Sequence, residues 1–95
     1  MQRGARELRT PLDRISPELA WQIVDGEGVV VDLPRRQMLG LSPTAAFVWS
    51  RIGSASEDEI AVELAREFDV DETTARADVA SFVAQLRDRG LVVPS

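Results

Sequence analysis

Residues 36–49 read RQMLGLSPTAAFVW, and within this short stretch the chain changes from one type of secondary structure to another. Residues 36–41 alternate between two faces, as the residues of a β-strand do. Ser42 then supplies a side chain suited to a helix N-cap, and Pro43 suits the first helical position. Apolar residues follow at helical spacing as far as Gly53, which favours a helix end. The stretch therefore predicts a strand that passes directly into a helix.

The residues before this stretch predict a β-hairpin. Residues 20–24 read AWQIV and residues 29–33 read VVVDL, two runs rich in residues that favour strands. An Asp-Gly pair at residues 25–26 opens the segment between them, and glycine supplies the positive φ that a tight hairpin turn needs. Pro34 ends the second run because it has no backbone N–H to donate. With residues 36–41 pairing back on the second run, we expect a three-stranded antiparallel sheet.

The residues after Gly53 predict two further helices. Ser56 and Glu59 have the spacing of a capping box, in which each side chain accepts a hydrogen bond from the backbone of the other residue. Asp71 is suited to cap the last helix, and Gly90 to end it. The apolar faces of these helices consist of Ile60, Leu64 and Phe68, and of Ala75, Val79, Phe82, Val83 and Leu86. Helices with such faces must cover the sheet, so we expect an α+β fold in which a three-helix bundle follows the three-stranded sheet, as in a winged helix.

The chain is expected to form one domain. Its 95 residues suffice for a single hydrophobic core. Residues 15–95 contain all the predicted elements and finish with a short extended segment at residues 91–93. Residues 1–14 lack hydrophobic periodicity, so we expect them to form a flexible N-terminal arm. No apolar run is long enough to span a bilayer, and no apolar segment follows the arginines of the arm, so we expect a cytoplasmic protein.

The composition excludes most kinds of catalytic or metal site. The sequence contains no Cys, His or Tyr, and all 11 of its basic residues are Arg. It therefore offers no thiolate nucleophile, no imidazole base or metal ligand, and no lysine for a Schiff base. The remaining carboxylates, arginines and hydroxyls do not form a carboxylate pair across any predicted cleft. We expect a binding protein rather than an enzyme, with no cofactor and no metal.

Six short motifs occur in a specific joint order over residues 15–93, although each alone is a capped helix or a hairpin. They are Ile15-Ser16-Pro17-Glu18-Leu19-Ala20, Val24-Asp25-Gly26-Glu27, Gly40-Leu41-Ser42-Pro43-Thr44-Ala45-Ala46-Phe47-Val48-Trp49, Phe68-Asp69-Val70-Asp71, Asp78-Val79-Ala80-Ser81-Phe82 and Arg89-Gly90-Leu91-Val92. Taken together, these motifs resemble the PqqD-like family. Family members usually carry Leu-Asn where this chain has Leu41-Ser42, and since both Asn and Ser cap helices, this difference does not affect the fold.

The resemblance implies that residues 15–95 form a PqqD-like peptide-recognition domain, of the kind called a RiPP recognition element. In that family the leader of a ribosomally synthesised precursor peptide adds as an extra strand beside the third strand, and the third helix forms the other wall of the groove. A free-standing member acts as a peptide chaperone that presents its precursor to a modifying enzyme, such as a radical-SAM enzyme or a leader protease. No nucleic-acid or membrane partner is implied, and we expect a monomer or a weak homodimer.

The predicted docking edge is the third strand, because an unpaired edge offers main-chain N–H and C=O groups to an extended peptide. We expect Leu39 and Leu41 to face the helices, and a proline at Leu39 to remove a donor from the ladder with the peptide. On the third helix, Asp78 is suited to pair with a basic leader residue, and Phe82 lies at the margin between core and groove. The predicted peptide-binding residues are Arg36, Gln37, Met38, Leu39, Gly40, Leu41, Asp78, Phe82 and Gln85.

Two other functions use the same elements. A winged helix can bind DNA, but residues 57–72 contain eight acidic residues and one arginine, which disfavours contact with a phosphate backbone. An adaptor or dimerisation domain would use the same strand edge and the same hydrophobic margin, so the sequence leaves that alternative open.

Overall fold

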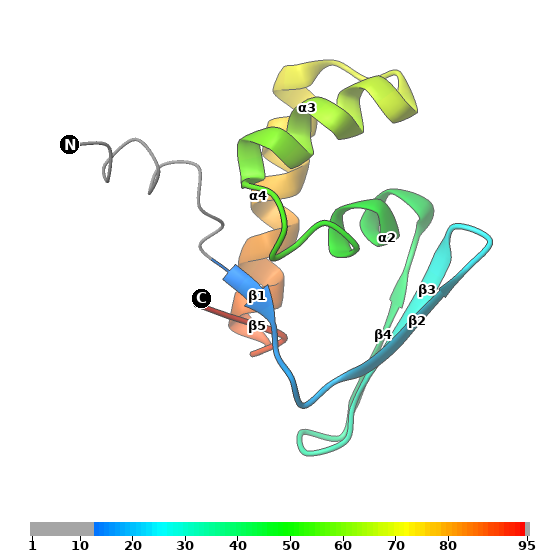
Figure 1. The fold of residues 1–95 in the computed structure, drawn as a ribbon, viewed down its shortest axis with the longest axis vertical. Coiled ribbons are helices and arrows are strands. Elements are labelled where there is room, and N and C mark those ends of the chain that lie inside the picture. The colour runs from blue at the N-terminus through cyan, green and yellow to red at the C-terminus, as the bar shows by residue number, and fades with distance from the viewer. Residues whose placement is uncertain (1–12, 95) are drawn as a thin grey trace.

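The computed structural model describes residues 13–94 and confirms the predicted α+β class. The elements are β1 Asp13–Ile15, β2 Ala20–Val24, β3 Glu27–Asp32, β4 Gln37–Leu41, α2 Pro43–Trp49, α3 Glu57–Phe68, α4 Glu72–Asp88 and β5 Val92–Pro94. Within this range, β2, β3 and β4 form an antiparallel sheet in that order, and β1 pairs with β5 in a separate two-stranded sheet. The helices lie together on one side of the larger sheet (Figure 1).

The hairpin between β2 and β3 turns through two residues. Asp25 and Gly26 have φ angles of 55° and 78°, the positive values that a two-residue type I′ turn requires at both positions. The second strand therefore begins at Glu27 rather than at Val29 as predicted, because the turn is complete after Gly26 and the next residue is already paired.

The turn between β3 and β4 corrects the predicted start of the third strand. The backbone N–H of Arg36 donates to the carbonyl oxygen of Leu33 at 3.1 Å, and Arg36 has a φ of 55°. A residue in this left-handed region does not continue an extended strand. The prediction that Arg36 belongs to the edge strand is therefore wrong, whereas residues 37–41 form it as predicted.

The pairing of β1 with β5 was not predicted. The two strands are antiparallel, with Arg14 opposite Val93. Residues 13 and 14 thus belong to the folded domain and not to the flexible arm expected over residues 1–14, and residues 1–12 of that arm lie outside the described residues. This pairing joins opposite ends of the chain, so no local sequence pattern announces it.

The helices begin at the predicted caps. The Ser42 side chain accepts from a backbone N–H at 3.3 Å, and Asp71 accepts from two. Ser56 and Glu59 form the reciprocal capping box, with distances of 2.9 and 3.2 Å. None of the helices in the described range is both long and apolar enough to cross a membrane.

The end of α2 lies earlier than Gly53, where the sequence placed it. Beyond Trp49 the chain continues in tight turns, in which the N–H of Arg51 donates to Val48 at 3.1 Å and that of Ile52 to Trp49 at 3.2 Å. Such bonds between residues three apart tighten a helix end and satisfy its last carbonyl groups. Gly53 itself has a positive φ of 92° and ends these turns rather than the helix.

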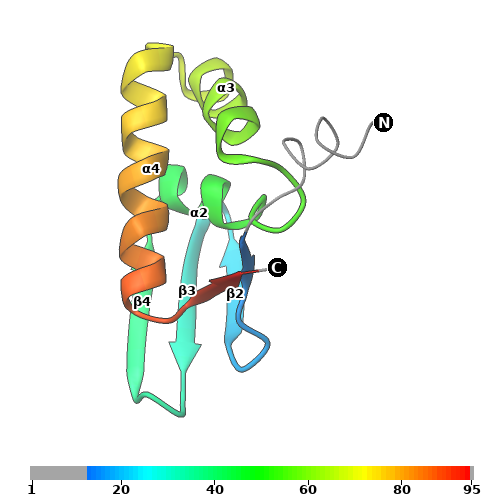
Figure 2. The same cartoon turned by 90° about the vertical axis from the view of Figure 1, so that its left-hand side faces the viewer.

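Two buried clusters hold the domain together, and α2 contributes to both. The first packs α2, α3 and α4 against one another, and the second packs the sheet against α2, the end of α4 and β5. Figure 2 shows α2 between α4 and the sheet, so this short helix packs against both. The predicted core positions of α4 are buried, while Phe82 is partly buried and packs against both clusters. The first cluster contains Val48, Ile60, Ala61, Leu64, Ala65, Ala75, Val79 and Val83, and the second Val30, Leu41, Ala46, Trp49, Leu86, Leu91 and Val92.

Two glycines of the sheet provide a matched test of this packing. A Cβ atom on Gly28 would lie 3.0 Å from Ile23 Cγ1 and 3.1 Å from Leu41 Cδ1, whereas one on Gly40 would meet no atom within 4 Å. We expect Gly28→Ala to lower the free energy of unfolding by about 1–2 kcal/mol through overpacking. Gly40→Ala should leave it unchanged or raise it by up to ~1 kcal/mol, because alanine loses less conformational freedom than glycine. Thermal unfolding followed by circular dichroism measures both, and equal melting temperatures for the two variants would contradict the packing.

Candidate functional site

β4 is an edge strand. It pairs with β3 on one side, and no strand of residues 13–94 pairs with its other side. β2 is the opposite edge of the sheet, but β4 lies on the same side of the molecule as α4 (Figure 2). An unpaired edge presents backbone N–H and C=O groups to which an extended chain can add.

The register of the sheet determines which backbone groups of β4 face outward. In a hairpin with a two-residue turn, the pair that flanks the turn is hydrogen-bonded, and the following pairs alternate between bonded and non-bonded. By this alternation the backbone of Val30 makes no hydrogen bonds to β2, and its N–H and C=O groups pair instead with Leu39 of β4. Leu39 therefore directs its N–H and C=O toward β3. The N–H and C=O groups of its neighbours Met38 and Gly40 point away from the sheet, so these two residues carry the free backbone groups of the edge. A proline at Leu39 would instead remove a hydrogen bond between β4 and β3 and so disturb the sheet itself.

The side chains of β4 alternate as predicted. Leu41 is buried, and Leu39 packs against the second cluster, so both face the helices. Met38 lies on the other face with 68% of its surface exposed. Gly40 also lies on that face, where no atom occupies the space of a side chain. The outer edge of β4 at Met38 and Gly40 is therefore sterically open.

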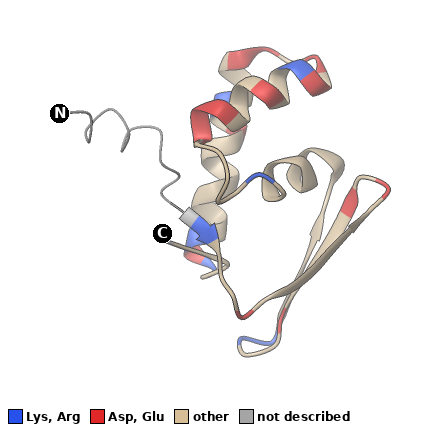
Figure 3. Cartoon of the chain, viewed as in Figure 1, with Lys and Arg blue, Asp and Glu red and all other residues tan. Residues whose placement is uncertain are grey.

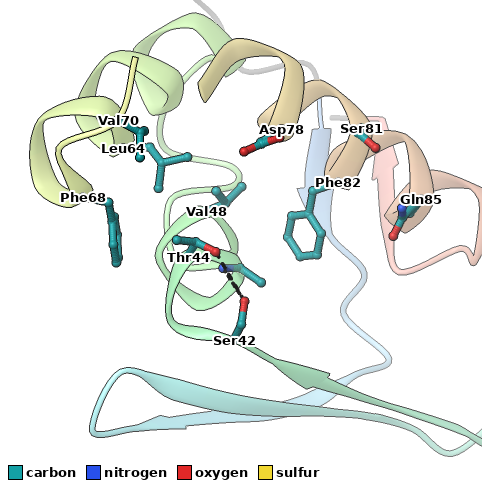
Figure 4. Close-up of a pocket in the computed structure, with 11 residues that line it drawn as sticks. Ser42, Thr44, Val48, Leu64, Phe68, Val70, Asp78, Ser81, Phe82 and Gln85 are labelled. Atoms are coloured by element: carbon teal, nitrogen blue, oxygen red, sulfur yellow. Dashed lines mark hydrogen bonds between the residues drawn. The ribbon is translucent and has the colours of Figure 1, made fainter. Parts of the chain in front are cut away.

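A pocket of about 310 Å³ opens beside the end of β4 (Figure 4). Its walls come from α2, from the end of α3 and from α4. Three of the predicted residues, Asp78, Phe82 and Gln85, line it, and Figure 4 shows them along one wall. Ser42, which directly follows β4, lies at its margin. The structure thus brings these three α4 residues together around one pocket near the end of β4, and their contact with a peptide stays a prediction. The pocket is lined by Ser42, Thr44, Ala45, Val48, Leu64, Phe68, Val70, Asp78, Ser81, Phe82 and Gln85.

Sequence reasoning missed the walls that α2 and α3 contribute. Val48 and Leu64 have helical spacing and were assigned to the core, which is correct, but they also line the pocket. Phe68 was expected in the core and is only partly buried. An apolar residue at a helix position looks the same in the sequence whether it faces a filled core or an open pocket. Val70, just beyond the end of α3, also lines the pocket and is exposed, which only the structure shows.

A polar clamp joins the start of β4 to the end of α4. Gln37 Nε2 donates to Asp32 Oδ2 and to the carbonyl oxygen of Arg89, both at 3.1 Å. Arg35 Nη1 donates to the same Asp32 oxygen at 3.2 Å, and the carboxylate is almost completely buried. The Gln37 amide is therefore occupied within the protein, and its predicted contact with a peptide stays a prediction. The clamp thus links the start of β4 to the residue that caps the end of α4.

Residues 27–92, well over half of the chain, match the family described as Coenzyme PQQ synthesis protein D (PqqD). This protein belongs to the PqqD family. The family predicted from the sequence is thus confirmed. Among proteins with curated functions, none matches the chain.

Two solved structures share the fold of this PqqD family member. One is described as "TbiB1 in Complex with the TbiA(beta) Leader Peptide", with a TM-score of 0.77 and 25% identity over 83% of this chain and 93% of that one. Another is described as "Lasso peptide synthetase B1 complexed with the leader peptide", with a TM-score of 0.77 and 29% identity over 86% of this chain and 98% of that one. Both similar proteins were solved with a leader peptide.

The charges of this PqqD family member are unevenly distributed. Figure 3 shows acidic residues along α3, with basic residues on β1 and in the turn between β3 and β4. On α4, Arg76 pairs with Asp58, and Arg87 Nη2 lies 3.1 Å from Glu57 Oε2. These arginines are already paired with carboxylates, which disfavours contact with a phosphate backbone. In the described part of the chain, no group of acidic residues is arranged to hold a metal ion.

The buried carboxylate of the clamp predicts a pH dependence of stability. Burial raises the pKa of Asp32, but the hydrogen bonds from Gln37 and Arg35 outweigh burial and hold this pKa below its ordinary value. A carboxyl whose pKa is lower in the folded state stabilises the protein above its unfolded pKa of about 4, and this contribution is lost as the pH falls through the folded pKa. We expect Asp32→Asn to be less stable than wild type at pH 7 and to lose less stability between pH 5 and pH 2.

Urea unfolding at a series of pH values measures this difference. Asp88→Asn is the matched control, because it makes the same change at an exposed position outside the clamp. Parallel pH profiles for wild type and Asp32→Asn would show that the clamp does not depend on the ionised carboxylate.

Proposed function

We propose that this protein binds the leader of a ribosomally synthesised precursor peptide by strand addition at β4 and presents the precursor to a modifying enzyme. The observation that carries the proposal is the free backbone edge at Met38 and Gly40 beside the pocket under α4. The two similar proteins solved with leader peptides support it.

Strand addition explains how such a site binds different leaders. The N–H and C=O groups of Met38 and Gly40 allow up to about four main-chain hydrogen bonds, each with a net value of about 1 kcal/mol. Because these bonds involve only the peptide backbone, they do not depend on the side chains of the leader. The edge therefore provides affinity for an extended chain in general.

The pocket provides the selectivity. Phe82, Val48 and Leu64 present apolar surface to one or two leader side chains, and burying each contributes about 1.5–3 kcal/mol. Ordering a flexible leader offsets about 2–5 kcal/mol of the total. These contributions sum to a binding free energy of at most about −8 kcal/mol, equivalent to a dissociation constant of roughly 1 μM or weaker. Such an affinity suits a carrier that must release its peptide.

The role we propose is presentation rather than catalysis. A leader bound along one strand edge leaves the rest of the precursor accessible to a second protein. The chain has no Cys or His to carry out nucleophilic or imidazole chemistry on the bound peptide. We therefore assign the chemistry to the partner, a radical-SAM enzyme or a leader protease.

Two substitutions of Met38 separate its backbone from its side chain. Met38→Pro removes the outward-facing N–H, and an edge strand tolerates proline at a position with no partner in the sheet. We expect Met38→Pro to weaken leader binding at least tenfold, since about 1.4 kcal/mol corresponds to that factor. Met38→Ala retains the N–H and should bind within about threefold of wild type. Isothermal titration with the leader from the nearest short open reading frame measures both.

The fold of each Met38 variant is checked by circular dichroism before titration. Equal affinities of folded Met38→Pro and wild type would exclude β4 as the docking edge. Self-association of wild type on concentration, with no response to leader, would instead favour the dimerisation alternative at the same edge.

Presentation is tested in a reconstituted reaction. We expect wild-type protein to raise the kcat/KM of the partner enzyme for the full precursor, because the bound leader brings the substrate to the enzyme. Met38→Pro should give no increase, and a precursor lacking its leader should show none with either protein. An equal increase with both proteins would contradict presentation through β4.

A further inference from the structure

The pocket beside β4 contains one ionisable side chain. Its walls are mainly apolar at Val48, Leu64, Phe68 and Phe82, and Asp78 is the one charged residue that lines it. In Figure 4 the Asp78 carboxylate lies beside Leu64 and Val48 and faces the same space. A side chain that enters the pocket therefore meets an apolar wall and a carboxylate together.

The Asp78 carboxylate has no hydrogen-bond or ion-pair partner among residues 13–94. The nearest cation in sequence, Arg76, pairs with Asp58 and Glu72 instead. Arg51, on the chain that follows α2, pairs with Glu63 at 2.7 Å. Arg76 and Arg51 are thus paired with carboxylates other than Asp78.

The surroundings of the pocket are also acidic. The segment of residues 67–71, which contributes Phe68 and Val70 to the pocket, carries Glu67, Asp69 and Asp71 as well. No basic residue lies in that segment or among the residues that line the pocket. Fixed negative charge of this kind attracts a cation and repels an anion.

We infer that this pocket selects leaders that carry an arginine or lysine in the segment next to the residues that pair with β4. The aliphatic stem of the basic side chain lies against Val48 and Leu64, and its charge reaches Asp78, as long basic side chains do at the edge of an apolar surface. An acidic residue at this position is rejected. This inference rests on the proposed function, and it names the class of precursor: one with a basic groove-bound segment.

The place of the basic residue in the leader follows from the positions of β4, Ser42 and Asp78 along the binding site. Ser42 directly follows β4 and lies at one side of the pocket, while Asp78 lies across from it (Figure 4). A leader paired with Met38 and Gly40 passes Ser42 before it reaches Asp78. The basic residue is therefore separated from the strand-forming segment and does not belong to it.

Three small probes test the charge preference directly. Hexylamine, 1-hexanol and hexanoate share one alkyl chain and carry a positive, a neutral and a negative head. Titration into labelled protein, followed through the backbone amides of Val48, Asp78 and Phe82, gives their dissociation constants. We expect hexylamine to bind about twofold to fivefold more tightly than 1-hexanol, the range of an exposed ion pair, and hexanoate to bind most weakly.

Matched variants connect this preference to Asp78. Asp78→Asn should bind hexylamine and 1-hexanol equally and should leave the affinity for 1-hexanol unchanged. Asp88→Asn, which makes the same change on α4 outside the pocket, should keep the wild-type preference. The inference is overturned if wild type shows no preference for hexylamine, if Asp78→Asn retains it, or if none of the probes shifts the pocket amides.

A selection from a displayed library of random peptides extends the test to leader-like ligands. Wild type should enrich Arg and Lys beside apolar residues, and Asp78→Asn should enrich the apolar residues alone. Enriched peptides that also bind Met38→Pro would contradict strand addition without affecting the charge preference. Enriched peptides that need Met38 but show no basic residue would contradict the charge preference alone.

Discussion

Trp49 occupies the position on which the rest of this structure depends. Its side chain has 0% of its surface exposed, and its ring meets the edge of Trp21 at a centroid distance of 5.9 Å. Its Nε1 has no hydrogen-bond partner among the described residues, so packing alone holds the ring in place. Because Trp49 ends α2 and is buried against the sheet, α2 is fixed between the sheet and α4. The ring belongs to the buried cluster that contains Leu41 of β4 and Leu86 of α4, so it joins the sheet to the end of that helix.

Different kinds of interaction hold the two ends of the proposed binding site in place. At one end, the Gln37 amide joins the Asp32 carboxylate to the last turn of α4, so the separation of strand and helix is set by directed hydrogen bonds. At the other end, beyond Ser42, the walls are apolar side chains around an open pocket. For the proposed strand addition, a site held in this way needs little reorganisation. Most of the entropy lost on binding then comes from the peptide, which keeps the expected affinity in the range of a reversible carrier.

The separation of backbone recognition from side-chain recognition bears on the PqqD family as a whole. The free N–H and C=O groups of an edge strand are the same for every sequence that forms that strand, so this part of the site can persist while side chains change. The pocket is lined by side chains of the helices, several of which are exposed and do not belong to the buried clusters. In this protein the pocket combines Phe82 with the unpaired carboxylate of Asp78. A change at a few such positions would redirect the domain to another precursor while its architecture stays intact.

The sequence by itself determined the order of the three sheet strands and the three helices, the helix caps and the family. Ser42, Ser56 and Asp71 act through neighbours two or three residues away, so their roles are visible in the local pattern. The inward orientation of Leu39 and Leu41 also follows from local alternation. Only the tertiary structure decided what depends on distant contacts. The pairing of β1 with β5 joins the ends of the chain, and the register that leaves Met38 and Gly40 with free backbone groups depends on the positive φ angles of Asp25 and Gly26. The pocket arises where three helices meet, and no local pattern distinguishes an apolar residue that fills a core from one that borders an empty space.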